Sequence, residues 1–276
     1  MESSNKQNIV AKTTSPSSIH IVTENPQSAN KAESIMFVMP AYNEEANIAD
    51  VVTQWYPVID RLNEEGVNAS LVIADDGSKD QTWSMMQQLA TSHPHFHPQT
   101  KANSGHGATI LHLYRHAIDN NVDYIFQTDS DGQTDPDEFW RFWKNRQNYD
   151  LQVGHRSSRE DGISRVFVTK VLKGVVWLTF HVNVTDANTP FRLMRTKSIK
   201  PILDIIPRDF FLSNVALSAI AVKKGLKTLW LPITFKPRQG GVNSINMKRI
   251  FKIGRKAVRD FIVLNRSVSC DTENES

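Results

Sequence analysis

The chain has 276 residues, of which 39% are hydrophobic and 22% are charged. This length suits one large α/β domain or two small domains, and we expect one main domain. The formal net charge of +3 is too small to indicate a nucleic-acid partner, and none is expected. The one cysteine, Cys270, cannot form an internal disulfide and favours a reducing compartment.

Both ends of the chain are polar. Residues 1–34 are rich in Ser, Thr, Asn, Gln and Lys, so a disordered tail is predicted there and again over residues 267–276. We expect no signal peptide. The longest apolar stretch, Val166–Val184, is interrupted by Lys170, Lys173 and other polar residues, so no transmembrane helix is expected. These features favour a cytoplasmic protein, with attachment to the inner face of a membrane left open.

Between the tails, short apolar runs alternate with longer amphipathic segments. This pattern is typical of an α/β fold with a mostly parallel central sheet and helices on both faces. Strands are predicted over Ile35–Met39, Leu71–Ala74, Tyr124–Thr128, Leu151–Val153 and Thr228–Phe235. Helices are predicted over Glu44–Leu62, Asp80–Leu89, Gly107–Asp119, Pro136–Arg146, Ser164–Phe180, Ser198–Ile205 and Leu212–Lys224. Asp135 before Pro136 and Ser78 before Gln81 predict helix caps.

Polar clusters follow each of the first three predicted strands. They are Pro40-Ala41-Tyr42-Asn43-Glu44, Asp75-Asp76-Gly77-Ser78 and Asp129-Ser130-Asp131. Because ligands bind outside the carboxyl ends of strands in open α/β sheets, all three clusters should face one crevice. An ordinary turn with a helix cap is the alternative for the second cluster, and a solvated loop is the alternative for the third.

Asp129 and Asp131 are the strongest candidates for chemistry. Their carboxylates lie one residue apart after the apolar run Tyr124-Ile125-Phe126, where they can hold Mg²⁺ or Mn²⁺ together with substrate phosphates. A metal there would stabilise the negative charge that grows on a departing nucleoside diphosphate. The chain has no G-x-x-x-x-G-K-[ST] phosphate loop, which argues against the commonest NTPase design.

Two further segments are rich in glycine or histidine. Asn103-Ser104-Gly105-His106-Gly107 precedes a predicted helix, and its glycines permit close backbone approach to a ligand or a tight turn. His93, His95 and His97 alternate with proline and other residues, and a polar loop is favoured there over a metal site.

Together with three arginine-containing segments, these motifs resemble family 2 glycosyltransferases. The segments are Val153-Gly154-His155-Arg156, Phe191-Arg192-Leu193 and the run from Arg238 to Ser244. The resemblance covers nearly everything from Ile35 to about Ile250 and is closest to the dolichol-phosphate and polyprenyl-phosphate sugar transferases. It implies the GT-A fold, a Rossmann-like nucleotide-diphospho-sugar transferase fold, over residues 35–245. It also implies a UDP- or GDP-type sugar donor and inversion at the anomeric carbon.

The resemblance also implies roles for individual residues. The metal ligands would be Asp129, Asp131 and Gln133. The base and ribose would meet Pro40, Tyr42, Glu44, Asp75 or Asp76, and Asn103, with Ala41, Gly105 and Ser130 in the same donor site. Arg156, Arg192 and Arg238 would surround phosphates, where a planar guanidinium grips oxygens in pairs. Arg238 and Ser244 would belong to a loop that closes over the donor. The catalytic set would be Asp131, Asp186, Arg192 and Arg238, although a buried or capping ion pair is the alternative for Arg192.

The chain departs from the family at two places. Many relatives carry an acidic residue in the helix that corresponds to Leu212–Lys224, which has none here. A phosphate acceptor is already anionic and needs no general base, so this departure favours a lipid-phosphate acceptor, unless Asp186 is the base. In place of a C-terminal membrane anchor, residues 246–266 predict a basic amphipathic helix. That helix would pack on the core of the protein or lie on an anionic membrane.

Two other functions compete with glycosyl transfer. A sugar-1-phosphate nucleotidyltransferase is also an α/β nucleotide binder, but it ordinarily has a glycine-rich basic loop where this chain has Pro40-Ala41-Tyr42-Asn43-Glu44. A catalytically silent nucleotide-sugar-binding protein is the non-enzyme alternative. The sequence indicates no oligomeric state.

Overall fold

The structure is a computed structural model that describes residues 31–156, 163–236 and 257–268, without the side chains of residues 156 and 163–169. The chain divides into two units, Met1–Lys31 and Ala32–Ser276, and the second is described below. Nearly all of the two predicted tails lies outside the described residues.

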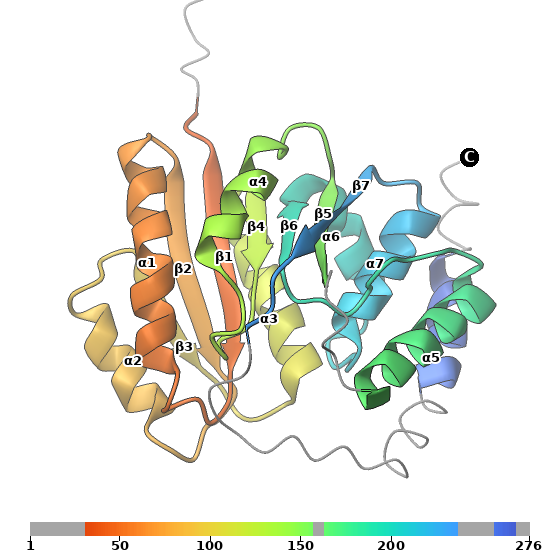
Figure 1. Ribbon diagram of the computed structural model, residues 1–276, viewed down its shortest axis with the longest axis horizontal. Coiled ribbons are helices and arrows are strands. Elements are labelled where there is room, and N and C mark those ends of the chain that lie inside the picture. The colour runs from red at the N-terminus through yellow and green to blue at the C-terminus, as the bar shows by residue number, and fades with distance from the viewer. Residues whose placement is uncertain (1–30, 157–162, 237–256, 269–276) are drawn as a thin grey trace, which may run out of the picture. The chain divides into compact units, whose positions relative to one another are not determined.

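A seven-stranded sheet forms the centre of this unit, in the order β3-β2-β1-β4-β6-β5-β7 (Figure 1). The strands are β1 (Ser34–Ala41), β2 (Asn68–Asp75), β3 (Phe96–Thr100), β4 (Tyr124–Gln127), β5 (Leu151–Arg156), β6 (Arg192–Arg195) and β7 (Thr228–Ile233). All neighbouring strands pair in parallel except β6, which is antiparallel to both β4 and β5. The predicted mostly parallel sheet is therefore confirmed.

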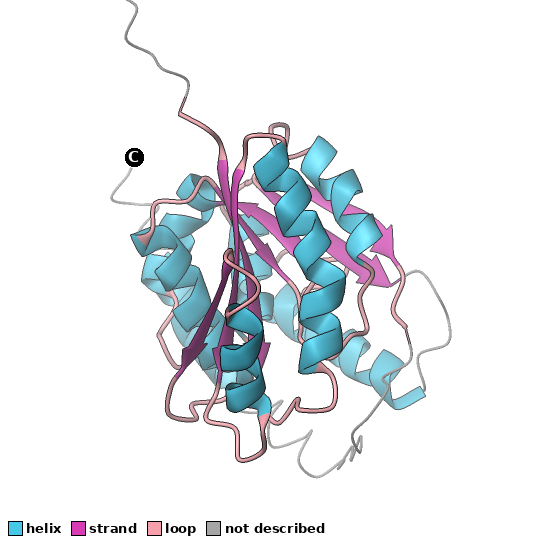
Figure 2. Cartoon of the chain, turned by 90° about the vertical axis from the view of Figure 1, so that its left-hand side faces the viewer, coloured by secondary structure: helices cyan, strands magenta, loops and turns pink. Residues whose placement is uncertain are grey.

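Helices cover both faces of the sheet, as predicted (Figure 2). They are α1 (Ile48–Glu64), α2 (Thr82–Ala90), α3 (His106–Asp119), α4 (Phe139–Lys144), α5 (Ile163–Phe180), α6 (Thr196–Ile205) and α7 (Ser213–Lys223), with a short 3-10 helix η1 (Pro136–Glu138) and a helical segment at 257–268. None of the helices in the described ranges has the length and apolar content that crossing a bilayer requires.

The apolar residues of β1 explain the two layers of helices. Ile35, Phe37 and Met39 belong to one buried cluster with α1 and α4, whereas Met36 and Val38 belong to a second cluster with α3, α6 and α7. Successive side chains of a strand point to opposite faces, so an uninterrupted apolar run is what a strand covered on both sides needs.

Two strands were not predicted. β3 lies at the edge of the sheet and includes Pro98, and it pairs only with β2, so the expectation of a loop around His97 was wrong. A proline is tolerated at an edge, where one side of the strand has no partner. β6 has four residues and an arginine at each end, so it carried little strand signal.

The two predicted caps had different outcomes. Asp135 Oδ1 accepts a hydrogen bond of 3.1 Å from the Asp137 amide, so the first cap is confirmed. The second was wrong: α2 begins at Thr82, and its first amide donates 3.0 Å to Asp80 Oδ1 rather than to Ser78.

Candidate functional site

The polar clusters after β1, β2 and β4 are joined by hydrogen bonds at one edge of the sheet. The Asn43 amide donates 2.9 Å to Ser78 Oγ, and the Lys79 amide donates 2.9 Å to Asn43 Oδ1. Ser130 Oγ donates 2.8 Å to the Pro40 carbonyl and so ties the third cluster to the first. The strand ends therefore meet as the sequence led us to expect, because β1, β2 and β4 are parallel neighbours.

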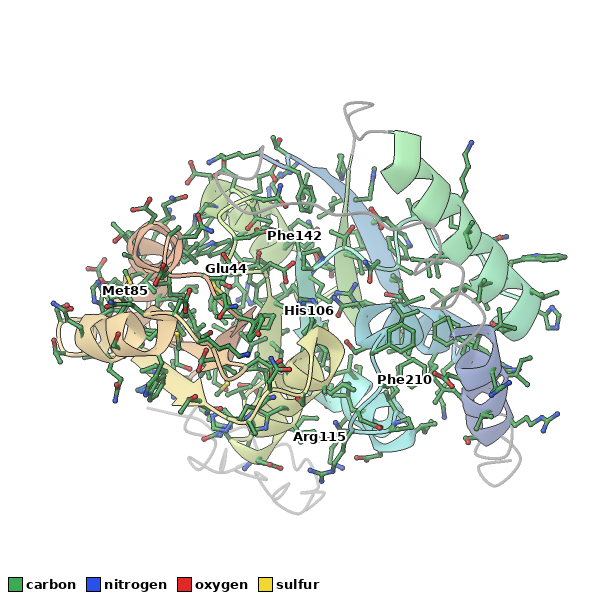
Figure 3. All side chains as sticks on the ribbon, turned by 90° about the horizontal axis from the view of Figure 1, so that it is seen from below. Glu44, Met85, His106, Arg115, Phe142 and Phe210 are labelled. Atoms are coloured by element: carbon green, nitrogen blue, oxygen red, sulfur yellow. The ribbon has the colours of Figure 1, made fainter. Side chains whose placement is uncertain are left out.

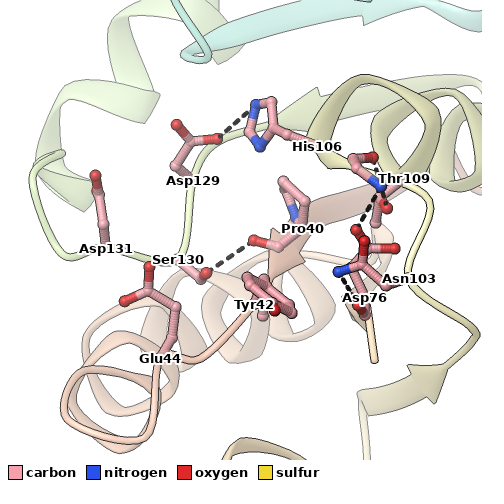
Figure 4. A pocket seen from close by; sticks show the side chains of 12 residues that line it. Pro40, Tyr42, Glu44, Asp76, Asn103, His106, Thr109, Asp129, Ser130 and Asp131 are labelled. Atoms are coloured by element: carbon pink, nitrogen blue, oxygen red, sulfur yellow. Dashed lines mark hydrogen bonds and ion pairs between the residues drawn. The ribbon is translucent and has the colours of Figure 1, made fainter. Parts of the chain in front are cut away.

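A cavity of about 410 Å³ lies between these clusters and the start of α3. Figure 3 labels Glu44, in the loop after β1, and His106, the first residue of α3, near the middle of the view from below. Twelve residues line the cavity: Pro40, Ala41, Tyr42, Glu44, Asp76, Asn103, Gly105, His106, Thr109, Asp129, Ser130 and Asp131 (Figure 4). Ten of these were predicted for the donor or metal site; the other two are His106 and Thr109.

Asp76 organises one wall of the cavity. The side chain is 3% exposed and forms an ion pair with Lys101. Its carboxylate also accepts 2.9 Å from the Ser104 amide and 2.8 Å from the Gly105 amide. Burial acts to raise the pKa of Asp76, but the hydrogen bonds from Lys101, Ser104 and other donors outweigh it, and the pKa is lowered. Asp76 therefore stays ionised and holds the loop before α3 in place.

Asp75 has a different role from Asp76. It is 2% exposed, and its two oxygens accept 3.0 Å from the Ser78 amide and 2.8 Å from Thr100 Oγ1. It does not line the cavity. Of the two alternatives that the sequence left open, only Asp76 faces a ligand space.

Carboxylates dominate the charge of the cavity. Four of the twelve lining residues are acidic, Glu44, Asp76, Asp129 and Asp131, and Asp76 is paired with Lys101. His106 Nε2 lies 3.9 Å from Asp129 Oδ1. A diphosphate entering so acidic a space would be repelled unless a cation came with it.

The donor set fits a cation that is shared with a substrate. Within the described ranges, no three His, Cys, Asp or Glu side chains are grouped so as to hold a metal by themselves. Asp129 and Asp131 supply two carboxylates on one short loop, and the Asp131 carboxylate is oriented by accepting 3.1 Å from the Gln133 amide. Mg²⁺ is usually bound in this way, by one or two carboxylates with substrate phosphates and water completing the shell.

The amino terminus of α3 faces the same cavity. Gly105 precedes the helix with a φ of +89°, a conformation that other residues rarely adopt. His106 and Thr109, three residues apart, lie on the side of α3 that lines the cavity. The positive end of a helix favours anions. Neither residue was predicted as part of the site. His106 follows Gly105 directly, and this position was the signal that could have identified His106. Thr109 could then have been identified as the residue one helical turn further along.

Arg192 does not occupy the position that was expected for a phosphate ligand. Its side chain is 0% exposed and donates to the carbonyls of Thr189, at 2.6 Å and 3.1 Å, of Ala187 at 3.1 Å and of Asn214 at 3.2 Å. Burial lowers the pKa of Arg192. The guanidinium therefore joins the loop before β6 to α7. It is neither a phosphate ligand here nor the simple ion pair that was the alternative.

Gln133, which was predicted to be a metal ligand, does not line the cavity, and that role stays a prediction. Its side-chain Nε2 donates 3.0 Å to the main-chain carbonyl of Lys236, and the main-chain carbonyl of Gln133 accepts 2.7 Å from the Lys236 amide. Nearby, Glu138 accepts 2.9 Å from the Thr234 amide. Gln133 thus fastens the loop that carries Asp131 to the residues that follow β7.

The remaining predicted residues are not brought into the cavity by the described structure. Asp186 is half-buried in the loop before β6 and is not among the residues that line the cavity. Arg156 ends β5, but its side chain lies outside the described residues, as do Arg238 and Ser244. Their assigned roles remain predictions.

Known proteins share this fold. A glucosyl-3-phosphoglycerate synthase from Mycobacterium tuberculosis, solved with Mn²⁺, uridine-diphosphate-glucose and phosphoglyceric acid, superposes with a TM-score of 0.62 at 16% identity, covering 84% of this chain and 80% of that one. The described unit therefore has the GT-A fold, as expected.

Two relatives of known function are similar to this chain in sequence. A polyprenol monophosphomannose synthase from Mycolicibacterium smegmatis is 23% identical over 86% of this chain and 91% of its own length. An undecaprenyl-phosphate 4-deoxy-4-formamido-L-arabinose transferase from Edwardsiella ictaluri is 22% identical over 79% of this chain, and the match spans 65% of that longer protein. The family model described as "Glycosyl transferase family 2" matches residues 36–203, more than half of the chain. The chain is thus a glycosyltransferase and belongs to glycosyl transferase family 2.

Proposed function

We propose that this enzyme is an inverting, metal-dependent glycosyltransferase that moves a sugar from a UDP- or GDP-type donor to a lipid phosphate of the polyprenyl phosphate class. The observation that carries the proposal is the meeting of three strand-end clusters around one acidic cavity, with the amino terminus of α3 opposite. The named relatives and the Mn²⁺ and nucleotide-sugar complexes of the structural neighbour support the same choice.

The lining residues divide into two groups in this proposal. Pro40, Ala41, Tyr42, Asn103 and Gly105 form the wall that takes the nucleoside, and Asp76 fixes the shape of that wall. Asp129 and Asp131 would hold Mg²⁺ or Mn²⁺, which supplies positive charge beside the diphosphate as it leaves. Arg156, Arg238 and Ser244 are proposed for the phosphates on the family resemblance alone.

The acceptor is inferred from the chemistry of the nucleophile. In an inverting transfer, an acceptor oxygen forms a bond to the anomeric carbon while the bond from that carbon to the diphosphate breaks on the opposite side. α7 contains no carboxylate, and Asp186 does not line the cavity. A phosphate monoester needs no proton removed before it attacks, whereas a sugar hydroxyl does. The described site therefore favours a phosphate acceptor.

The test is calorimetric titration with UDP- and GDP-sugars, with and without Mn²⁺. Asp131→Asn should weaken Mn²⁺-dependent binding by at least roughly ten-fold, since loss of even an outer partner of a metal ligand costs that much. Asp137→Asn is the matched control, because Asp137 is an exposed carboxylate in η1, six residues further along the chain, and does not line the cavity. If neither donor class binds, or if both variants bind like the wild type, the proposal fails. Release of pyrophosphate from a nucleoside triphosphate would indicate a nucleotidyltransferase instead.

A further inference from the structure

Large apolar side chains are exposed on two neighbouring helices. Trp177 and Leu178 on α5 are 56% and 60% exposed, and Ile262 and Val263 on the 257–268 helix are 42% and 59% exposed. Among the described residues, the one other large apolar side chain with comparable exposure is Tyr42, which lines the donor cavity. We call the four residues on the two helices the apolar patch.

The two helices contact each other through buried aromatic side chains. The rings of Phe180 on α5 and Phe261 on the 257–268 helix lie 5.7 Å apart, and both side chains are buried. Each helix thus buries apolar side chains other than those of the patch, among them Val176 on α5 and Leu264 on the 257–268 helix. The apolar patch is consequently additional to the core, and leaving it in water costs free energy that a partner would recover.

The two helices that carry the patch also carry exposed basic side chains. Lys170 and Lys173 are exposed on α5, which contains no acidic residue. Arg259 and Arg266 are exposed on the other helix, where Asp260 is the one acidic residue. Tryptophan and aliphatic side chains with flanking lysine and arginine are the composition that binds the interface of an anionic bilayer.

The location of the patch agrees with a membrane occupant. α5 lies at the end of the molecule toward which β1 and β4 point, the lower end in Figure 1. The donor cavity opens among the residues that follow these two strands. A bilayer that meets α5 would therefore lie at the same end of the protein as the cavity.

We infer that the exposed faces of α5 and the 257–268 helix form a docking surface for an anionic lipid bilayer, with Trp177 and Leu178 entering the headgroup region. This inference deepens the proposed transfer to a lipid phosphate, since it names the surface that brings the cavity to the acceptor. It needs neither donor nor acceptor, so it can be tested separately.

The experiment is flotation of the full chain with vesicles of phosphatidylcholine and phosphatidylglycerol, and with vesicles of phosphatidylcholine alone. The wild type should float with the anionic vesicles. Trp177→Gln combined with Leu178→Gln should weaken binding by at least about ten-fold. Lys170→Gln combined with Lys173→Gln should weaken it roughly twenty-five-fold at low salt, at about five-fold for each charge.

Two further variants serve as controls for net charge and for the position of the tryptophan ring. Lys144→Gln combined with Lys197→Gln changes the net charge equally at exposed positions away from the patch and should leave binding unchanged. Trp177→Phe should still bind, but quenching of tryptophan fluorescence by brominated lipid should fall, because this ring is the one placed in the bilayer.

Two results would overturn the inference. One is vesicle binding that is indifferent to both the Trp177 and Leu178 pair and the Lys170 and Lys173 pair. The other is a wild type that ignores vesicles but sediments as a dimer that the Trp177→Gln and Leu178→Gln variant dissolves, since the patch would then bind a second copy of the chain. Either result leaves donor binding, and with it the proposed activity, untouched.

Discussion

Replacing Gly107 by alanine should destabilise the protein, although alanine is the better helix former. Gly107 is the second residue of α3, and a Cβ there would lie 2.3 Å from the Phe211 carbonyl oxygen and 2.6 Å from that of Phe210. The shorter distance is 1.1 Å below the 3.4 Å at which ordinary van der Waals contact begins. Both obstacles are backbone atoms, so relief requires α3 or the 210–211 segment to move.

The size of the effect follows from two opposing terms. Overpacking of this kind costs about 1–3 kcal/mol, and replacing a helical glycine by alanine recovers roughly 0.5–1 kcal/mol. The two terms leave a net loss of about 0–2.5 kcal/mol. Because the 2.3 Å contact is with a backbone atom, we expect a value in the upper part of this range, about 1–2 kcal/mol. A loss of 1 kcal/mol lowers the melting temperature of a unit of this size by about 2–4 °C, so a decrease of roughly 2–8 °C is expected.

Gly174→Ala provides the matched comparison. Gly174 is also helical, on α5, but a Cβ there meets nothing within 4 Å. The same substitution should raise the melting temperature by roughly 1–4 °C. Differential scanning calorimetry of both variants decides the matter. If Gly107→Ala melts at or above the wild type, the close contact between α3 and the 210–211 segment is not a real constraint and the reasoning is refuted.

Three other predictions concern buried or titrating groups. Lys101→Met removes the cation beside Asp76 and should lower the free energy of unfolding in urea by about 1–3 kcal/mol at neutral pH. Because the pKa of Asp76 is lowered in the fold, this loss should shrink as the pH falls below 3.8, the ordinary pKa of an Asp side chain. Burial lowers the pKa values of His97 and His112, with smaller contributions from nearby histidines and, for His112, from Lys101. Stability should therefore fall as pH drops through 6.5, and glutamine at both positions should flatten the dependence of the melting temperature on pH. Arg192→Lys keeps the charge but cannot bridge three carbonyls, so its urea midpoint should report a loss of about 2–4 kcal/mol, and a loss below about 0.5 kcal/mol would contradict the bridging role.

The sequence predicted the core of the site because the signals there are local. Each of β1, β2 and β4 is an apolar run that ends in a polar cluster, and parallel neighbours bring such ends to one edge. The position of Asp129 and Asp131 in the cavity followed from that rule. The different roles of Asp75 and Asp76 did not follow from that rule. Asp75 is held by a hydrogen bond from Thr100 on β3, and β3 was not predicted as a strand.

The position of Arg192 could not be predicted for a related reason. Its acceptors include the carbonyl of Asn214 on α7, twenty-two residues further along the chain. Backbone carbonyls have no sequence signature, so a buried arginine that bonds to them resembles an exposed arginine that binds phosphate. The antiparallel insertion of β6 between β4 and β5 makes Arg192 the first residue of an interior strand, where it is buried. A strand of four residues with an arginine at each end gave no sign of this position in the sequence.

The double hydrogen bond between Gln133 and Lys236 has a thermodynamic consequence. The main-chain amide of Gln133 also donates a hydrogen bond to the Asp131 carboxylate. A cation bound by Asp131 is therefore connected to Lys236 through one residue, Gln133. Free-energy linkage is reciprocal, so if a ligand that displaces Lys236 changes the affinity for the cation, the cation changes the affinity for that ligand by the same factor. The order in which a metal and a second ligand are added would then change the path but not the final occupancy.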